Sequence, residues 1–221
     1  MKKMWDGQRL GEMLVGIILI GLCVGLYRLS GFGVDPFSCM NLGISGFLGM
    51  SFGNWQLLMN LAIFLVVIFF AREYVGLGTI VNMVFVGYLA DFFCWAALDV
   101  MMVEVTPVLR VVFLLAGTLC SSLGCAFYMT AALGIAPYDA VAFILIRFTG
   151  NRLSFRAARV GSDVVVMTVG IVFSVLSGNG IWAVAGLGTL VNACLNGPLI
   201  QFFKNLLAAR SDKYVSTANC Q

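Results

Sequence analysis

The chain has 221 residues, of which 61% are apolar and 10% are charged; its formal net charge is +3, and it contains no histidine. Soluble domains have about half apolar and about a quarter charged residues, so this composition excludes a soluble globular protein. The missing histidines argue against zinc, haem and histidine-base chemistry, and the charge is spread over loops rather than gathered for a nucleic acid. We therefore expect a membrane protein without catalytic residues, metal or cofactor and without a nucleic-acid partner.

Six long apolar stretches are expected to cross the membrane as helices, because each is long enough, or nearly so, for a hydrocarbon core of about 30 Å. They lie at residues 11–31, 55–71, 76–98, 108–132, 160–177 and 182–203. Two shorter segments, 34–49 and 136–149, occupy equivalent places between these stretches. Pro36 and Pro137 fit the first turn of a helix in each short segment. The sequence leaves open whether the short segments cross the membrane.

The two halves of the chain repeat one another. Gly-Leu-Gly-Thr-Ile-Val-Asn at 76–82 returns as Gly-Leu-Gly-Thr-Leu-Val-Asn at 186–192. Upstream, Gly-Val-Asp-Pro-Phe at 33–37 matches Gly-Ile-Ala-Pro-Tyr at 134–138. A duplication within so apolar a chain is typical of transporters and channels built around a pseudo-two-fold axis.

The repeat defines the expected organisation of the chain. We expect one membrane domain over 1–221, with a first repeat at about 10–98, a second at about 108–205 and a polar cytoplasmic tail at 206–221. No cleavage site follows the basic start of the chain, so the first stretch is expected to remain as a span.

The charges of equivalent loops favour inverted repeats. The N-terminal end carries three basic residues, whereas its counterpart at 99–110 carries two acidic residues and one arginine. The region at 147–159 carries four arginines, whereas the loop after 34–49 has no charge. By the positive-inside rule this opposed bias places equivalent loops on opposite sides, which requires three crossings in each half.

We therefore expect an all-α, polytopic transmembrane bundle of two homologous halves, each with three spans and one short re-entrant helix. It would lie in the bacterial inner membrane with both termini in the cytoplasm. The alternative is an ordinary eight-span bundle with uneven loops.

Polar side chains within apolar stretches mark the candidate site, because they are costly at membrane depth unless paired or hydrated. Asn82 and Asn192 match across the repeat and follow the Gly-x-Gly-Thr motif. Two interpretations remain open. The amides either hydrogen-bond between packed helices or contact a pore or substrate.

Asp35 and Asp139 lie beside the two prolines. Asp35 is placed to cap the first short helix, and Asp139 lies in the first turn of the second, where a helix dipole favours an anion. Ordinary capping is one interpretation. The other places both carboxylates at a central cavity that binds a cation, a proton or an amine, with Tyr138 and Ser38 as neighbouring substrate-binding residues.

Three further charged features have local explanations. Asp163 lies four residues after Arg159, a spacing that predicts a salt bridge on one helix face. Asp91 is expected at the membrane interface. The arginines at 147–159 are most simply a positive-inside loop, with binding of anionic lipid head groups as a second interpretation.

Two groups of motifs carry a resemblance to a known family. They are Gly134-Ile135-Ala136-Pro137-Tyr138-Asp139, and Gly186-Leu187-Gly188-Thr189 followed by Gly197-Pro198-Leu199-Ile200-Gln201-Phe202-Phe203. At these residues the chain resembles the YczE/YyaS/YitT family of bacterial integral membrane proteins, nearest its YczE branch, over nearly its whole length. Gln201 stands where an acidic residue often occurs, and Asp91 holds the matching place in the first half. The resemblance implies a membrane location and a fold more than an activity.

Two functions from different classes follow from these observations. The first is a small-solute transporter or channel, with a site near the midplane between the repeats where the ends of 34–49 and 136–149 meet. The alternative is a non-transporting integral membrane accessory or regulatory protein that acts through a partner. Membrane lipid and an unknown small solute are the expected ligands, and a homo-oligomer or a protein partner remains open. An enzyme is the least expected, because the sequence has no nucleophile–base pair and no metal-ligand set.

Overall fold

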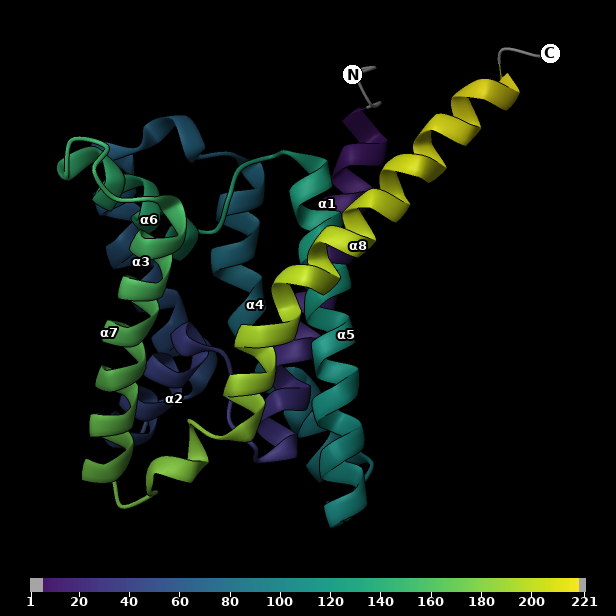
Figure 1. The fold of residues 1–221 in the computed structure, drawn as a ribbon. Coiled ribbons are helices and arrows are strands. Elements are labelled where there is room, and N and C mark those ends of the chain that lie inside the picture. Colours follow the sequence, from purple (N-terminus) through teal and green to yellow (C-terminus); the bar gives the residue numbers. More distant parts are fainter. Residues whose placement is uncertain (1–5, 219–221) are drawn as a thin grey trace.

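The computed structural model describes residues 6–218, which form an all-helical bundle (Figure 1). The helices are α1 (Asp6–Ser30), α2 (Pro36–Leu48), α3 (Phe52–Phe70), α4 (Leu77–Trp95), α5 (Pro107–Ala131), α6 (Pro137–Phe148), α7 (Phe155–Leu176) and α8 (Leu187–Ala218). Three short helical turns, Arg72–Tyr74, Ala96–Val100 and Ile181–Ala183, join them. No strand occurs between residues 6 and 218.

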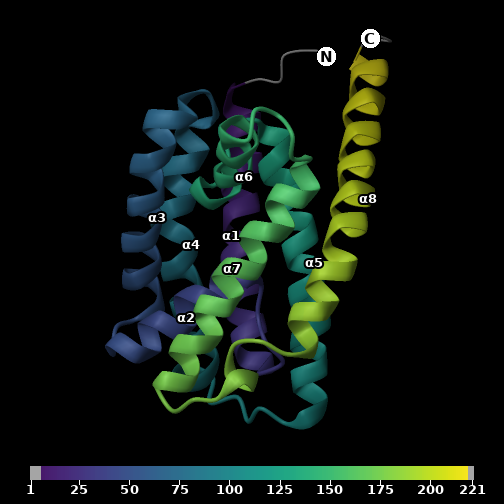
Figure 2. The same cartoon turned by 60° about the vertical axis from the view of Figure 1, so that its left-hand side comes forward.

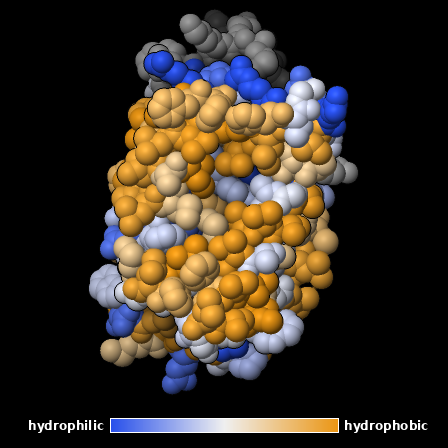
Figure 3. Space-filling view, turned by 90° about the vertical axis from the view of Figure 1, so that its left-hand side faces the viewer, coloured by the Kyte–Doolittle hydropathy of each residue, from blue (hydrophilic) through white to orange (hydrophobic). Residues whose placement is uncertain are grey.

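Five helices in the described part of the chain are long and apolar enough to cross a membrane. They are α1, α3, α4 with the turn that follows it, α5 and α7. Their outer faces carry large apolar side chains such as Phe69, which is 81% exposed. Figure 3 shows that one whole face of the molecule is mainly apolar, with polar side chains at its ends and in a hollow. The chain is therefore a polytopic helical membrane protein, as the composition predicted.

The sixth predicted span, 182–203, differs from expectation. It forms the first part of α8, which is not among the helices apolar enough to cross. Asn192, Asn196 and Gln201 lower the hydropathy of this part, and Pro198 lies inside the helix. The helix continues to Ala218, so most of the predicted polar tail at 206–221 is helical; residues 219–221 lie outside the described range.

Both short segments form helices that are too short to span a bilayer. α2 has 13 residues and α6 has 12, so they are about 20 Å and about 18 Å long, compared with about 30 Å of hydrocarbon. Each begins with its proline in the first turn. Asp35 caps α2, as predicted, because its Oδ1 accepts a hydrogen bond from the Ser38 N–H at 3.0 Å.

The long helices α1 and α5 form the central pair of the bundle. They run antiparallel, and they approach so closely at Gly16 and Gly124 that a Cβ atom on Gly16 would lie 2.8 Å from the Gly124 carbonyl oxygen. Arg9, near the start of α1, donates hydrogen bonds to the carbonyls of Ala131 and Ala132 at the end of α5. The first turn of α1 therefore lies beside the last turn of α5.

The remaining helices surround this pair in matching positions. α4 packs against α1, and α8 packs against α5. Each short helix packs against a long helix of the other half, α2 against α7 and α6 against α3. In Figure 1, α6 lies at the end where α1 begins, and α2 lies toward the other end. Figure 2 shows α3 and α4 side by side at one edge and α8 at the opposite edge.

The arrangement predicts which connections face the cytoplasm. We expect a cysteine at Asn151, in the connection between α6 and α7, to react with an impermeant maleimide only after cells are permeabilised, because the region at 147–159 carries four arginines. A cysteine at Met102, which is 78% exposed, should react in intact cells. Met102 belongs to the connection between α4 and α5, and α5 begins at the end of the bundle opposite α6 (Figure 1). Both variants are to be made with Cys220→Ser, which removes a thiol near the C-terminus. Labelling of Met102→Cys from inside only would contradict the inverted topology.

Candidate functional site

The Gly-Leu-Gly-Thr motif of the second half binds the loop that precedes α2. The Thr189 hydroxyl donates to the carbonyl of Val34 at 2.8 Å, and the Gly188 N–H donates to the carbonyl of Phe32 at 2.7 Å. The Val34 N–H in turn donates to the carbonyl of Val184 at 3.2 Å. These bonds satisfy backbone groups that no helix pairs, at a depth where unpaired groups are costly.

The first half makes the reciprocal contact. The Gly78 N–H donates to the carbonyl of Leu133 at 2.8 Å, and the Ile135 N–H donates to the carbonyl of Tyr74 at 3.2 Å. The motif of each half therefore holds the loop of the other half, with nearly equal bond lengths in both places. We call these two sets of contacts the reciprocal clamps.

The glycines at 33 and 134 allow the reciprocal clamps to form. Their φ angles are +92° and +111°, which side chains other than glycine rarely adopt. A Cβ atom on Gly33 would lie 2.6 Å from Thr189 Oγ1, and one on Gly134 would lie 2.5 Å from Thr79 Oγ1. The two sequence motifs of the repeat are thus explained by one contact between them.

The reciprocal clamps bring the N-terminal ends of α2 and α6 together. The rings of Phe37 and Tyr138, which are equivalent in the repeat, stack with centroids 4.5 Å apart and an interplanar angle of 13°. Offset stacking of aromatic rings is favourable beyond the area that it buries. We call this contact the central stack, and it lies where the sequence analysis expected the two short segments to meet.

A cluster of charged side chains surrounds Tyr138. Arg159 Nη1 lies 2.5 Å from Asp139 Oδ1, and Arg159 Nε lies 3.4 Å from Asp163 Oδ2. The guanidinium also lies over the Tyr138 ring, 4.6 Å from its centroid, and the Tyr138 hydroxyl donates to Asp163 Oδ1 at 2.6 Å. We call these four residues the charged cluster. The predicted salt bridge between Arg159 and Asp163 is confirmed.

The side of the membrane on which the arginines at 147–159 lie stays a prediction, but Arg159 has an additional role. Arg159 lies within α7 and not in the connection before it. The sequence pattern showed only its neighbour Asp163 at helical spacing. The shorter contact of Arg159 is with Asp139 of α6, and this pairing depends on how α6 and α7 pack together.

The equivalent residues of the first half are neutral. In the repeat Phe37 corresponds to Tyr138, and the serine caps Ser51 and Ser154 begin the matching helices α3 and α7. This register pairs Asp139 with Ser38, Arg159 with Gln56, and Asp163 with Asn60. All three neutral partners are buried. The two halves therefore share a backbone arrangement, but at these three positions only the second half carries charge.

The structure places the six sequence-predicted site residues in two groups. Asp35, Ser38, Tyr138 and Asp139 lie at the facing ends of α2 and α6. Asp35 caps α2 two residues before Phe37, which forms the central stack with Tyr138.

Asn82 and Asn192 form the second group. They lie in α4 and α8, one turn beyond the threonines Thr79 and Thr189, and both are buried. Neither side-chain amide makes a hydrogen bond to the backbone or to a side chain that the structure describes. The interhelical hydrogen bond that one interpretation required is not present there.

Sequence reasoning missed two further ion pairs, Arg28–Asp91 and Arg147–Glu73. Arg28 Nη1, near the end of α1, lies 2.6 Å from Asp91 Oδ1, and Asp91 Oδ2 accepts the Gly53 N–H at 2.7 Å. Arg28 also lies over the ring of Phe52. A single arginine near the end of a span gave no signal of a partner, because its carboxylate lies 63 positions away in the chain.

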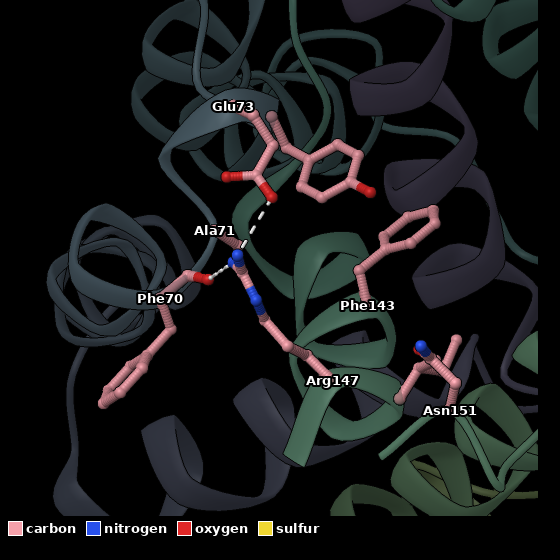
Figure 4. Close-up of a pocket in the computed structure, with 8 residues that line it drawn as sticks. Phe70, Ala71, Glu73, Phe143, Arg147 and Asn151 are labelled. Carbon is pink, nitrogen blue, oxygen red and sulfur yellow. Dashed lines mark hydrogen bonds and ion pairs between the residues drawn. The ribbon is translucent and has the colours of Figure 1, made fainter. Parts of the chain in front are cut away.

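Two hollows lie at opposite ends of the bundle. The α6 hollow has a volume of about 190 Å³ and is lined by Phe70, Ala71, Glu73, Tyr74, Phe143, Ile146, Arg147 and Asn151 (Figure 4). Arg147 extends across it to the carbonyl oxygen of Phe70 at 2.8 Å and to Glu73 at 3.5 Å. The α2 hollow, of about 480 Å³, is lined by Arg28, Leu42, Ser45, Gly46, Met50, Ser51, Phe52, Asp91, Ser174, Asn179 and Val184.

The two hollows are equivalent under the repeat. The register that matches Gly33 with Gly134 also matches Leu42, Ser45, Gly46 and Met50 of the α2 hollow with Phe143, Ile146, Arg147 and Asn151 of the α6 hollow. Each hollow follows the C-terminal half of one short helix, while the N-terminal ends of both helices meet at the central stack. The central stack and the charged cluster thus lie between two hollows that are lined by equivalent positions of α2 and α6.

The clamp geometry predicts the effect of adding one methyl group. Gly134→Ala should lower the free energy of unfolding by about 1–3 kcal/mol, because the backbone is left-handed there and the new Cβ would meet Thr79. Gly161→Ala is the matched control, since a Cβ there has no neighbour within 4 Å, and it should be neutral or gain up to about 1 kcal/mol. Equal effects of the two changes in a detergent unfolding titration would contradict the clamp.

A second prediction separates the two interpretations of the paired asparagines. Asn82→Ala should change the free energy of unfolding by less than about 0.6 kcal/mol, the average for a polar contact between membrane helices, because its amide has no partner among the described residues. Asn41→Ala is the control and should cost more, since its buried amide donates to the Phe37 carbonyl at 2.9 Å. A loss for Asn82→Ala as large as that for the control would restore the packing interpretation.

Comparison with known proteins supports the family resemblance. Residues 7–205 match the model of a family of unknown function, DUF6198. The chain is similar to an uncharacterized protein of Haemophilus influenzae, at 27% identity over 93% of this chain and 88% of the relative. It is also similar to the uncharacterized protein YyaS of Bacillus subtilis, at 22% identity over 86% of this chain and 89% of the relative. A third relative is the uncharacterized membrane protein YczE of Bacillus subtilis, at 23% identity over 85% of this chain and 81% of the relative. No solved structure matches the chain. The family model covers nearly the whole bundle, clamps and charged cluster included, so this protein belongs to the DUF6198 family, with YczE and YyaS among its relatives.

Proposed function

We propose that this protein carries a small solute across the bacterial inner membrane, with its two halves acting as inverted repeats and its termini in the cytoplasm. The observation that carries the proposal is the central stack, where the N-terminal ends of two non-spanning helices meet beside the charged cluster. Broken helices that meet at a charged interior are the usual construction of a substrate site in transporters with inverted repeats.

The surroundings of the charged cluster favour a site that contains water. The Asp139 side chain is 47% exposed, although α6 packs within a bundle whose outer faces are apolar. An exposed carboxylate facing hydrocarbon would cost several kcal/mol, so charges at such depth usually face a polar cavity. Non-helical backbone such as the loops before α2 and α6 is likewise tolerated only in protein or beside water.

The two hollows supply the ends of a route. The α2 hollow and the α6 hollow lie at opposite ends, and the central stack and charged cluster lie between the helices that line them. Rocking of one half against the other would widen one hollow toward the centre while the other closes. The repeat relationship makes the two closed ends structurally alike, which is what alternating access requires.

The alternative function is a non-transporting membrane accessory protein that acts through a partner. In that case the polar centre would serve only to join the halves, and no solute would reach it. The two functions therefore differ in whether reagents in water reach the facing ends of α2 and α6. We expect no chemical conversion of the solute in either case.

Cysteine accessibility tests this difference without knowledge of the solute. Ser38 is 3% exposed, so a cysteine at this position is reached only when the halves move. In a variant whose seven native cysteines are replaced, we expect Ser38→Cys to react with a small charged methanethiosulfonate from either side of the membrane, because the reactive thiolate needs water.

Val165→Cys is the matched control, because this position on α7 is 63% exposed and its apolar surroundings should leave the thiol unreactive. Modification of Ser38→Cys from neither side, with the folded protein recovered, would favour the accessory function. Modification from one side only would rule out alternating access.

A further inference from the structure

We infer that the charged cluster is a binding site for one organic cation bearing an ammonium or guanidinium group, and that Arg159 is a tethered occupant which such a cation displaces. The inference rests on the proposed function, because it identifies the chemical class of the solute. It begins from what Arg159 itself contacts. A cationic nitrogen group is held there by a carboxylate at 2.5 Å, a second at 3.4 Å and an aromatic face at 4.6 Å.

The charge balance of the interior favours a cation over an anion. Two carboxylates, those of Asp139 and Asp163, contact the single guanidinium of Arg159. A third, that of Asp35, caps the helix whose first turn meets α6 at the central stack. The N-terminus of α2 offsets part of the Asp35 charge through its N–H groups and dipole. The remaining excess is negative, so an added cation would lower the electrostatic cost of the site and an added anion would raise it.

The contacts of Arg159 are of a kind that an incoming group can replace. Its side chain is 33% exposed, so it is partly open rather than locked into the core. Arginine and alkylammonium groups both pair with carboxylates and both lie over aromatic rings. A solute with such a group would receive the contacts from Asp139, Asp163 and Tyr138 that Arg159 gives up.

A buried hydroxyl on the central pair points to a ligand independently. Tyr128 of α5 is buried, and its hydroxyl has no hydrogen-bond partner within the described chain. Its ring lies beside Gly78 of the reciprocal clamps, where an added Cβ atom would be 3.3 Å from Tyr128 Cε2. Its pseudo-equivalent, Tyr27 of α1, donates to Thr118 instead. The free oxygen of Tyr128 is available as an acceptor for an ammonium N–H.

The site is single and suits a nitrogen cation better than a metal ion. In the first half, Ser38, Gln56 and Asn60 replace the charged residues, so the repeat does not supply a second site of the same charge. No group of three carboxylate, thiol or imidazole side chains in the described residues is spaced to hold a metal ion. The ion pair and the ring face are instead suited to a group that donates several hydrogen bonds.

Removal of the tethered cation tests the inference by chemical rescue. Arg159→Gln copies the equivalent residue Gln56 and leaves both carboxylates without their partner. We expect its melting temperature in detergent to lie below that of the wild type. Ethylguanidinium or methylammonium at millimolar concentration should raise that temperature in a saturable way, with a half-saturating concentration at least tenfold lower than for the double variant Arg159→Gln/Asp139→Asn.

Arg147→Gln is the matched control, because Arg147 pairs with Glu73 at a surface where both side chains are more than half exposed. It should show no saturable rescue. Equal rescue by sodium chloride, rescue of the control, or stabilisation of Arg159→Gln by acetate in place of the cations would overturn the cation site. If Arg159→Gln aggregates, the measurement is whether the variant can be purified as monodisperse protein in the presence of each salt. Monodisperse protein with ethylguanidinium but not with sodium chloride supports the inference, and aggregate in both overturns it.

Binding and movement are measured separately. Uptake of radiolabelled methylguanidinium into proteoliposomes containing the wild-type protein tests transport, whereas the thermal rescue tests only the site. Rescue without uptake would retain the cation site and remove the proposed transport function. Uptake without rescue would retain transport and show that the solute binds elsewhere.

Discussion

The structure depends on one interaction, the reciprocal clamp between the Gly-Leu-Gly-Thr motif of each half and the loop before the short helix of the other half. Without it, the loops at 31–35 and 132–136 would leave backbone groups unpaired inside the membrane, where each costs several kcal/mol. The clamps also set the direction in which the chain re-enters the bundle after α1 and α5. The meeting of α2 and α6, and hence the interior that they enclose, follows from that direction.

The reciprocal clamps explain why the matching motifs of the two halves recur at backbone contacts and not among the interior side chains. Glycines are needed at both 33 and 134, because each clamp requires close backbone approach. The two threonine hydroxyls differ, since Thr189 donates to Val34 of the other half and Thr79 donates to Tyr74 of its own half. The residues that face the interior have no such constraint. One half therefore carries the charged cluster around Arg159, while the other carries neutral side chains on the same framework.

The ion pairs at the two ends of the molecule also differ between the halves. Arg28 and Asp91 line the α2 hollow, whereas Arg147 and Glu73 line the α6 hollow, and these pairs are not equivalent in the repeat. A common backbone thus presents different charges to the two ends. Under the proposed transport function, unequal ends would bias the side on which a solute is bound, while the shared framework would allow both conformations.

The sequence by itself determined the membrane class, the approximate positions of the helices and the capping of α2, because span length, proline position and caps are properties of neighbouring residues. The repeat also indicated that the two short segments belong together. Only the tertiary structure decided which partners meet. Arg159 and Asp139 are 20 positions apart, Arg28 and Asp91 are 63 apart, and Thr189 and Val34 are 155 apart. Local pattern carries no information on such pairs, since their contacts exist only after the two halves have packed against each other.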